Sequence, residues 1–173
     1  MSAANRVRQF LLAAAAFVTR QGDSAAAAGG LLPPEGVDLF GGLPAYDRRH
    51  ALSVMHTLLE QGHNDPDLLA AALLHDVGKT GSPAGRLRLG HRVLMVLIGA
   101  LAPGWIDRLA HEGNGSWRQA FFVQAHHAEL GAELALKVGC TQVTAELIRQ
   151  HEADAVPGQD PRAAALRAAD AAN

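Results

Sequence analysis

The stretch ALLHDVGKT, residues 72–80, decides both the fold class and the candidate chemistry of this chain. A run of Ala and Leu, typical of a buried helix, ends in an imidazole and a carboxylate, His75 and Asp76. Burying two such groups is costly unless something pairs with them. The dipeptide alone indicates little, because the histidine can bond to a backbone carbonyl and the aspartate can cap a loop. Its meaning depends on partners elsewhere in the chain.

The composition is that of a single globular domain with no bias towards polyanions. The 173 residues carry 15 Lys and Arg against 17 Asp and Glu, a formal charge of −2, so we expect no nucleic-acid partner. Cys140 is the only cysteine, which excludes an internal disulfide and favours a cytoplasmic location. The apolar run 93–102 is shorter than the roughly 20 residues that span a bilayer. We expect a buried helix there rather than contact with a membrane surface.

The pattern predicts an all-α fold, a single helical bundle. Alanine dominates, and the alternation of apolar and polar residues that marks strands is rare. The pairs Asp65-Pro66 and Asp160-Pro161 mark helix starts, since Asp caps a helix and Pro fits its first turn. Asp47 looks like a third N-cap. We expect a connector with one short helical turn at 29–44, and helices at 5–20, 47–61, 67–77, 89–101, 105–110, 118–125, 128–138, 142–153 and from 161 to the last residue.

His50 is predicted to lie on the core-facing side of its helix. Val54 and Leu58 follow it by one and two turns, so the imidazole shares their apolar stripe. His56 is about 240° around the same helix from His50, which places it on the surface or in contact with residues that bind a ligand, and not among those residues. His50 is therefore the histidine of this helix that can meet the pair at the end of the next one.

The same spacing recurs late in the chain. His151 lies four and eight residues after Leu147 and Val143, on the apolar face of its helix. Asp170 follows a leucine at four residues, and a carboxylate on the buried side of a helix is costly without a partner such as a metal cation. An ion pair with Arg167, or exposure at a frayed terminus, is the alternative for Asp170.

The adjacent histidines His126 and His127 leave a choice. His127 shares a face with Leu130 and Leu134, whereas His126 shares a face with Phe122 one turn earlier. One of the two imidazoles can bind a metal while the other touches substrate. We expect His127 to be the ligand and His126 to contact the substrate.

The candidate ligands offer imidazole nitrogens and carboxylate oxygens but no sulfur. This set suits Mn²⁺, Fe²⁺, Co²⁺, Ni²⁺, Zn²⁺ or Mg²⁺ rather than a zinc ion held by thiolates. Six ligands are too many for one open catalytic ion but enough for two, which can share a hydroxide and bind a phosphoryl oxygen. We expect one or two divalent ions, with Asp76 as the bridge between two. The six are His50, His75, Asp76, His127, His151 and Asp170.

In their order along the chain, these residues resemble the HD domain superfamily of metal-dependent phosphohydrolases. The segments that carry the resemblance are RRHALSVMHTLLE, LLAAALLHDVGKT and ALRAADAAN, and HAELGAELALKVGCTQVTAELIRQHEAD is similar to the region that supplies extra histidines in two-metal members. The resemblance implies an HD domain at 46–173. It does not cover residues 1–45, which we expect to form an N-terminal helix and connector packed on that domain. It also implies that His50, His75, Asp76 and Asp170 bind one ion, and that His127 and His151 bind a second one bridged by Asp76.

The activity that the resemblance implies is hydrolysis of a phosphoester or phosphoanhydride in a nucleotide-like small molecule by a metal-activated water. Asp76 and Lys79 would lie at the catalytic centre, since Lys79 resembles the family lysine near the substrate phosphate. The chain lacks the GYP tripeptide of the cyclic-di-GMP phosphodiesterases, which argues against that activity. Arg86, Arg88 and Arg92 can neutralise phosphate charge, or can form a solvated basic loop.

Two other hypotheses use the same residues. A di-iron oxygenase has a similar set of ligands, with metals that activate O₂ instead of water. A nucleotide-sensing or interaction module would keep the fold without catalysis. The identity of the metal separates the first from a hydrolase, and nucleotide binding without turnover identifies the second. The sequence leaves the oligomeric state open.

Overall fold

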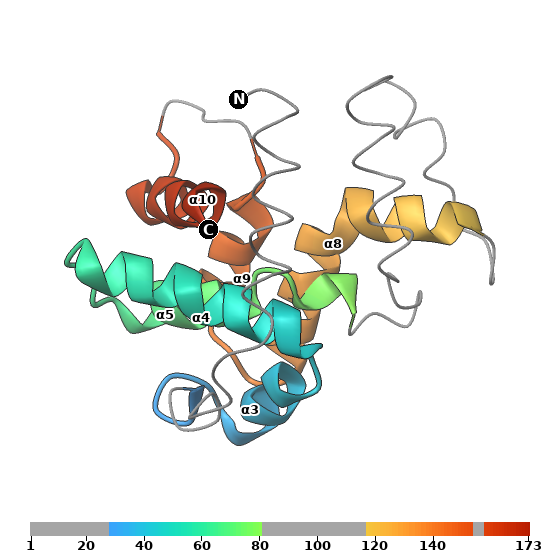
Figure 1. Cartoon of the computed structure of the whole chain (residues 1–173), viewed down its shortest axis with the longest axis horizontal. Coiled ribbons are helices and arrows are strands. Elements are labelled where there is room, and N and C mark those ends of the chain that lie inside the picture. Colours follow the sequence, from blue (N-terminus) through green and yellow to red (C-terminus); the bar gives the residue numbers. More distant parts are fainter. Residues whose placement is uncertain (1–27, 81–116, 154–157) are drawn as a thin grey trace.

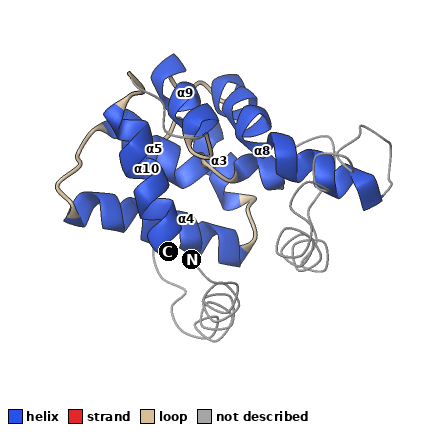
Figure 2. Cartoon of the chain, turned by 90° about the horizontal axis from the view of Figure 1, so that it is seen from above, coloured by secondary structure: helices blue, strands red, loops and turns tan. Residues whose placement is uncertain are grey.

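Helices make up the described part of the chain, which confirms the all-α prediction. The computed structural model describes residues 28–80, 117–153 and 158–173, and no strand occurs within these ranges (Figures 1 and 2). None of their helices is both long and apolar enough to cross a membrane. The elements are α3 (Pro34–Gly41), α4 (Ala45–Glu60), α5 (Pro66–Leu74), the 3₁₀ helix η2 (Val77–Lys79), α8 (Trp117–Lys137), α9 (Gln142–Gln150) and α10 (Pro161–Ala172).

Helix α5 lies at the centre of the bundle. It contacts α4, α9 and α10, and Figure 1 shows it running beside α4. Every residue from Leu68 to Leu74 is buried, as a helix that is apolar on all sides requires. Its start is the predicted one, because the Asp65 side chain accepts a hydrogen bond from the Leu68 amide at 2.9 Å. The central helix therefore carries the His75-Asp76 pair at its C-terminal end.

The second Asp-Pro pair also starts a helix as predicted. Asp160 accepts a hydrogen bond from the Arg162 amide at 2.9 Å at the beginning of α10. The Arg162 guanidinium pairs with Asp160 at 2.8 Å and with Asp65 at 3.0 Å. One arginine thus joins the N-terminal ends of α5 and α10, which helps to fix where their C-terminal residues lie.

The helix starts at the N-terminal side differ from the predictions. Asp47 is not an N-cap: α4 begins at Ala45 after Pro44, whose backbone is extended, and Asp47 is buried in the first turn. The segment expected to hold one short turn forms the eight-residue helix α3. Its proline at the first helical position favours a helix start, and burial of Phe40 in the core holds the helix in place.

The helix ends and one break also differ. Helix α8 is continuous where a break between 125 and 128 was expected, because no Gly or Pro interrupts it there. Helices α5 and α9 end at Leu74 and Gln150, three residues earlier than expected, and a histidine forms the C-cap of each. Gly78 does not end α5 but lies inside η2. The helices expected at 5–20, 89–101 and 105–110 lie outside the described residues.

Candidate metal centre

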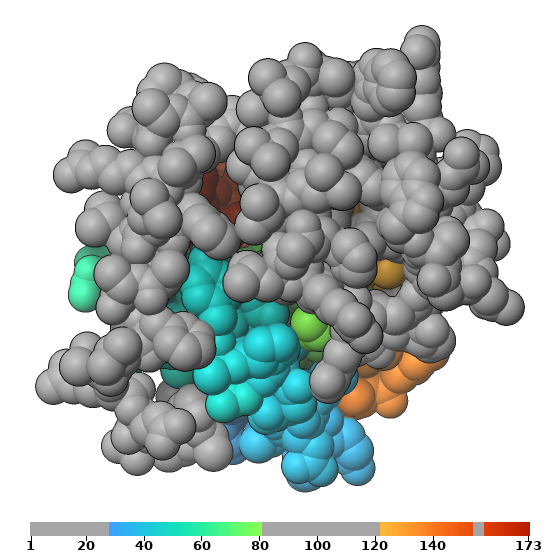
Figure 3. Space-filling view, turned by 45° about the vertical axis from the view of Figure 1, so that its right-hand side comes forward, coloured from blue at the N-terminus to red at the C-terminus, as the bar shows by residue number. Residues whose placement is uncertain are grey.

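The six candidate ligands come from all sides of the bundle and meet at one place. His50 is on α4, His127 on α8 and Asp170 on α10, while His75 and His151 are the C-caps of α5 and α9. Asp76 lies between α5 and η2, immediately before Val77. Figure 3 shows one face of this region, where atoms at the end of η2 (green) lie beside α4 (cyan).

Asp76 occupies the middle of the cluster. Its Oδ1 atom lies 3.8 Å from Nε2 of His75, 3.6 Å from Nε2 of His127 and 3.9 Å from Nε2 of His151. Potential ligand atoms lie within 4.8 Å of one another in two groups, His50 with His75 and Asp76, and Asp76 with His127 and His151. The two groups share Asp76, as a bridging carboxylate would require.

Asp170 lies next to the group formed by His50, His75 and Asp76. Its Oδ1 atom lies 2.8 Å from Nε2 of His50 and 3.4 Å from Nε2 of His75. Burial alone would raise the pKa of Asp170, but the two imidazoles outweigh it and hold the pKa well below its ordinary value. The alternative partner Arg167 instead donates to the carbonyl groups of Gln150 and Ala153.

Backbone carbonyl groups fix the orientation of the three buried imidazoles. In His75, His127 and His151, Nδ1 bonds to the carbonyl oxygen three residues earlier, at 2.8, 2.8 and 2.7 Å respectively. A carbonyl oxygen only accepts, so Nδ1 carries the hydrogen and Nε2 of the neutral ring carries a lone pair. Metal-binding histidines are commonly held in this way.

The Nε2 atoms of these three histidines are left without a hydrogen-bond partner among the described residues, although all three are buried. An unsatisfied buried polar atom costs about 1–3 kcal/mol. A lone pair that faces a carboxylate oxygen adds repulsion, which a cation between them turns into attraction. Ligand atoms about 2.1 Å from a common ion lie about 3.0–3.4 Å apart, and the separations found here, 2.8–3.9 Å, lie on both sides of that range. The residues present therefore fit divalent metal ions.

The charge states of His127, His151 and Asp76 also suit a metal. Burial is the main reason why the pKa of His127 falls to about 3 and that of His151 to about 4, so both are neutral at pH 7. Burial opposes ionisation of Asp76, but Lys79 and the imidazoles outweigh it and hold its pKa well below the ordinary value. Burial alone would lower the pKa of His75, but the carboxylates of Asp76 and Asp170 outweigh it and raise this pKa. Neutral imidazoles and ionised carboxylates are the forms that bind metals.

The predicted catalytic and substrate-binding residues lie at different distances from the centre. Lys79 is next to it, with Nζ 2.6 Å from Oδ1 of Asp76. His126 is exposed on α8, and its ring lies 4.4 Å from that of Phe122, centroid to centroid. Their roles stay predictions. Arg86, Arg88 and Arg92 lie outside the described residues.

Glu152 is a residue of the centre that the sequence reasoning missed. Its Oε1 atom lies 3.5 Å from Nε2 of His127, and half of its side-chain surface is exposed. Burial of its carboxyl group and the negative charges of Asp76 and Asp170 raise the pKa of Glu152, whereas Lys79 lowers it. Helical spacing could not find Glu152, because α9 has ended by Gln150. The available signal was its position directly after a candidate ligand, like that of Asp76 after His75.

Two of the apolar faces used for the prediction differ from those observed. Leu130 and Leu134 are only half-buried, and the buried residues near His127 on α8 include the small Gly131 and Ala135. Small residues let η2 approach α8 closely. On α9, Leu147 is buried but Val143 is 38% exposed, so only one of the two shares the buried side with His151.

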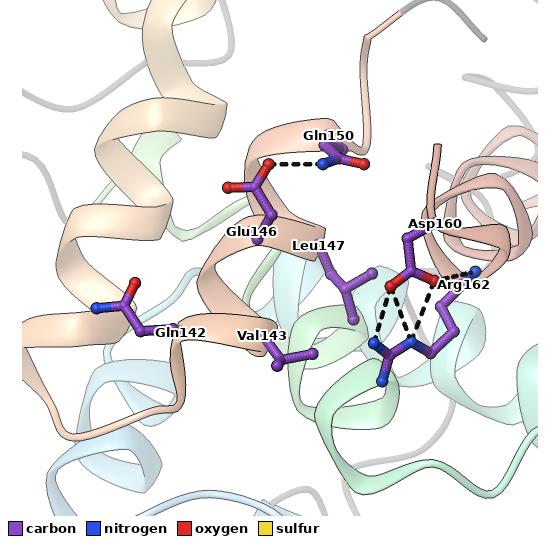
Figure 4. Close-up of a pocket in the computed structure, with 7 residues that line it drawn as sticks. All are labelled: Gln142, Val143, Glu146, Leu147, Gln150, Asp160 and Arg162. Atoms are coloured by element: carbon purple, nitrogen blue, oxygen red, sulfur yellow. Dashed lines mark hydrogen bonds and ion pairs between the residues drawn. The ribbon is translucent and has the colours of Figure 1, made fainter. Parts of the chain in front are cut away.

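A surface pocket lies apart from these ligands, at α9 and the start of α10. It has a volume of about 330 Å³, and none of the candidate ligands lines it. Figure 4 shows four of its polar side chains bonded in pairs, Glu146 to Gln150 and Asp160 to Arg162. The histidine and carboxylate cluster is therefore the candidate functional site, and the pocket is separate from it. The pocket is lined by Gln142, Val143, Glu146, Leu147, Gln150, Asp160 and Arg162.

The chain belongs to the HD domain family, which it matches over residues 48–172. No curated protein and no solved structure matches it. The matched range contains all six candidate ligands and Glu152. HD domains bind divalent metals and are mostly metal-dependent phosphohydrolases, which agrees with the donor atoms of the cluster.

Proposed function

We propose that this HD domain protein is a metal-dependent phosphohydrolase that cleaves a phosphoester or phosphoanhydride bond in a small, nucleotide-like molecule. The observation that carries the proposal is the convergence of three buried imidazoles, His75, His127 and His151, on one oxygen of Asp76. Nitrogen and oxygen donors without thiolates favour the divalent ions that bind phosphate oxygens. A small molecule rather than a nucleic acid is proposed because a formal charge of −2 gives no overall attraction for polyanions.

Two ions fit the two groups of ligands. His50, His75 and Asp170 would hold one ion, His127 and His151 the other, and Asp76 would bind both. Ions in such a site lower the pKa of a bound water to near neutrality and attract phosphoryl oxygens, which is the chemistry that this hydrolysis needs. The chain contributes the orientation: the Nδ1 bonds fix the imidazole rings before any ligand arrives.

Lys79 is the residue that we propose for the substrate phosphate. Its ammonium group pairs with Asp76 at 2.6 Å, on a flexible four-carbon side chain. When Asp76 binds metal, this ammonium group can turn to a phosphate oxygen and stabilise its developing negative charge. His126 is exposed one residue away from His127, where it can contact the rest of the substrate.

Phosphate release with added Mn²⁺ tests the proposal. A panel of nucleoside mono-, di- and triphosphates and cyclic nucleotides should contain a substrate. His75→Ala and Asp76→Asn should lower turnover at least about a hundredfold, because each removes a metal ligand. His56→Ala is the matched control, since His56 is exposed on the same helix as His50. Activity that survives Asp76→Asn would contradict the proposal.

The same experiment separates the two alternatives. With Fe²⁺ in place of Mn²⁺, oxygen consumption without phosphate release would replace the hydrolase by an oxygenase, since imidazole and carboxylate ligands also suit iron. Nucleotide binding by metal-loaded protein without any turnover would instead identify a sensor. Both outcomes would overturn the proposed reaction and leave the metal centre intact.

A further inference from the structure

We infer that Glu152 is a seventh metal ligand and completes the half of the centre formed by Asp76, His127 and His151. The inference rests on the metal centre and not on the reaction that the centre catalyses. Three observations on the described residues carry it. Glu152 faces the metal-side nitrogen of His127, its carboxylate and that nitrogen repel each other without a cation, and it gives its half of the centre a carboxylate as Asp170 does in the other half.

Glu152 lies on the metal side of His127. Its Oε1 atom is 3.5 Å from Nε2, the nitrogen that also faces Asp76 at 3.6 Å. A carboxylate that only orients a metal-binding histidine pairs with the other ring nitrogen. In His127 that nitrogen, Nδ1, already donates to the carbonyl oxygen of Gln124 at 2.8 Å. Glu152 is therefore placed as a ligand is placed, and not as an orienting group.

No hydrogen bond explains the approach of Glu152 to His127. Since Nδ1 carries the hydrogen of the neutral ring, Nε2 offers a lone pair, and it has no hydrogen-bond partner in the described part of the chain. A lone pair and a carboxylate oxygen 3.5 Å apart repel each other. A cation that binds both atoms removes this repulsion. The separation is also close to the roughly 3.4 Å between two ligands on one tetrahedral ion.

Glu152 gives the second half of the centre a carboxylate of its own, as Asp170 does in the first half. On one side, Asp170 lies 3.4 Å from Nε2 of His75; on the other, Glu152 lies 3.5 Å from Nε2 of His127. Each half then consists of two imidazoles, one carboxylate of its own and the shared Asp76. Both halves suit the same class of ion, a divalent transition metal bound by nitrogen and oxygen.

Metal titration of the full chain tests the role of Glu152 independently of activity. Protein stripped with a chelator is titrated with Mn²⁺ by calorimetry, and bound ions are counted by elemental analysis and electron paramagnetic resonance. The wild type should bind two ions that are magnetically coupled. Glu152→Gln should weaken binding of the second ion at least about tenfold and leave the affinity for the first ion unchanged. Its paramagnetic resonance signal should be that of an isolated ion. Glu133→Gln, an exposed carboxylate on α8, should behave as the wild type.

A second variant guards against a folding defect. Glu152→Asp keeps the carboxylate, so it should bind the second ion more tightly than Glu152→Gln, with both variants compared by circular dichroism. The inference would be overturned if Glu152→Gln bound two coupled ions with wild-type affinity. It would also be overturned if Glu152→Asp bound the second ion no more tightly than Glu152→Gln. If the metal results hold and phosphate release fails, only the proposed reaction is lost.

Discussion

At the scale of single residues, the centre depends on a repeated contact between a histidine and the carbonyl three residues before it. This contact holds His75, His127 and His151 with Nε2 facing Asp76. Helical spacing predicted the inward direction of His50 and Asp170 because both lie within regular helices. His75 and His151 lie at helix ends, where the spacing no longer fixes direction, and Glu152 lies beyond one. The sequence could therefore propose the ligands but not their arrangement.

Acidification should destabilise the metal-free protein between pH 6.5 and about 4. His127 and His151 have pKa values of about 3 and about 4 when folded, against 6.5 when unfolded. The unfolded chain therefore takes up protons that the folded chain does not, and each histidine removes up to about 1.4 kcal/mol of stability per pH unit. His75 acts in the opposite direction, because its raised pKa stabilises the fold at low pH and this contribution is lost as the pH rises.

Urea unfolding of the wild type and His127→Gln at pH 7, 6 and 5 checks this expectation. The lowered pKa values of His127 and His151 should outweigh the raised pKa values of His75 and Glu152, so the free energy of unfolding of the wild type should fall as the pH falls. His127→Gln should show a shallower fall. Asp76 and Asp170 have lowered pKa values and lose their contribution only below the ordinary aspartate value of 3.8, outside this window. Equal pH dependence in both proteins would contradict the account.

Replacing Lys79 should separate metal binding from turnover. Lys79→Met removes the positive charge 2.6 Å from Asp76, so Mn²⁺ should bind as tightly as before or more tightly. Phosphate release should nevertheless fall about a hundredfold, the usual cost of losing one group that stabilises transition-state charge. Lys137→Met, at an exposed lysine in the last turn of α8, is the control. Unchanged turnover in Lys79→Met would exclude a role for this lysine.

At the scale of elements, the close packing of η2 against α8 places Asp76. A Cβ atom at Gly78 would overlap the carbonyl oxygen of His127 and lie 2.8 Å from the amide nitrogen of Gly131. The sequence showed a glycine there but suggested a helix stop, since nothing local reveals a neighbouring backbone. The Asp-Pro starts of α5 and α10 were predictable because a cap acts within a few residues.

Gly78→Ala should therefore damage both stability and the metal centre. The backbone overlap should cost about 1–3 kcal/mol in the free energy of unfolding. It should also move Asp76 away from His127 and weaken Mn²⁺ binding. Gly41→Ala, at an exposed helical glycine with no atom within 4 Å of the added Cβ, should leave both properties unchanged. Thermal unfolding and calorimetric titration measure the two effects, and a Gly78→Ala protein identical to the wild type would refute this packing argument.

At the scale of the whole molecule, the candidate metal ligands join the C-terminal ends of α5 and α9 to α4, α8 and α10. Ions that bind only the folded chain should stabilise it by about 2.7 kcal/mol each at a concentration one hundred times the dissociation constant. The thermal unfolding temperature should rise with Mn²⁺ and fall after chelation. Asp170→Asn should lose part of this rise, and His56→Ala should keep all of it. An unfolding temperature that does not change with Mn²⁺ would mean that no ion bridges these helices.

The metal content of purified protein shows whether the cluster around Asp76 is a metal centre. Wild type and Asp76→Asn are dialysed against the same Mn²⁺ buffer and analysed for metal per chain. We expect two ions per wild-type chain and less than one in Asp76→Asn, because the bridging ligand serves both halves. A wild-type chain without bound metal, or an Asp76→Asn chain with as much metal as the wild type, would contradict this expectation.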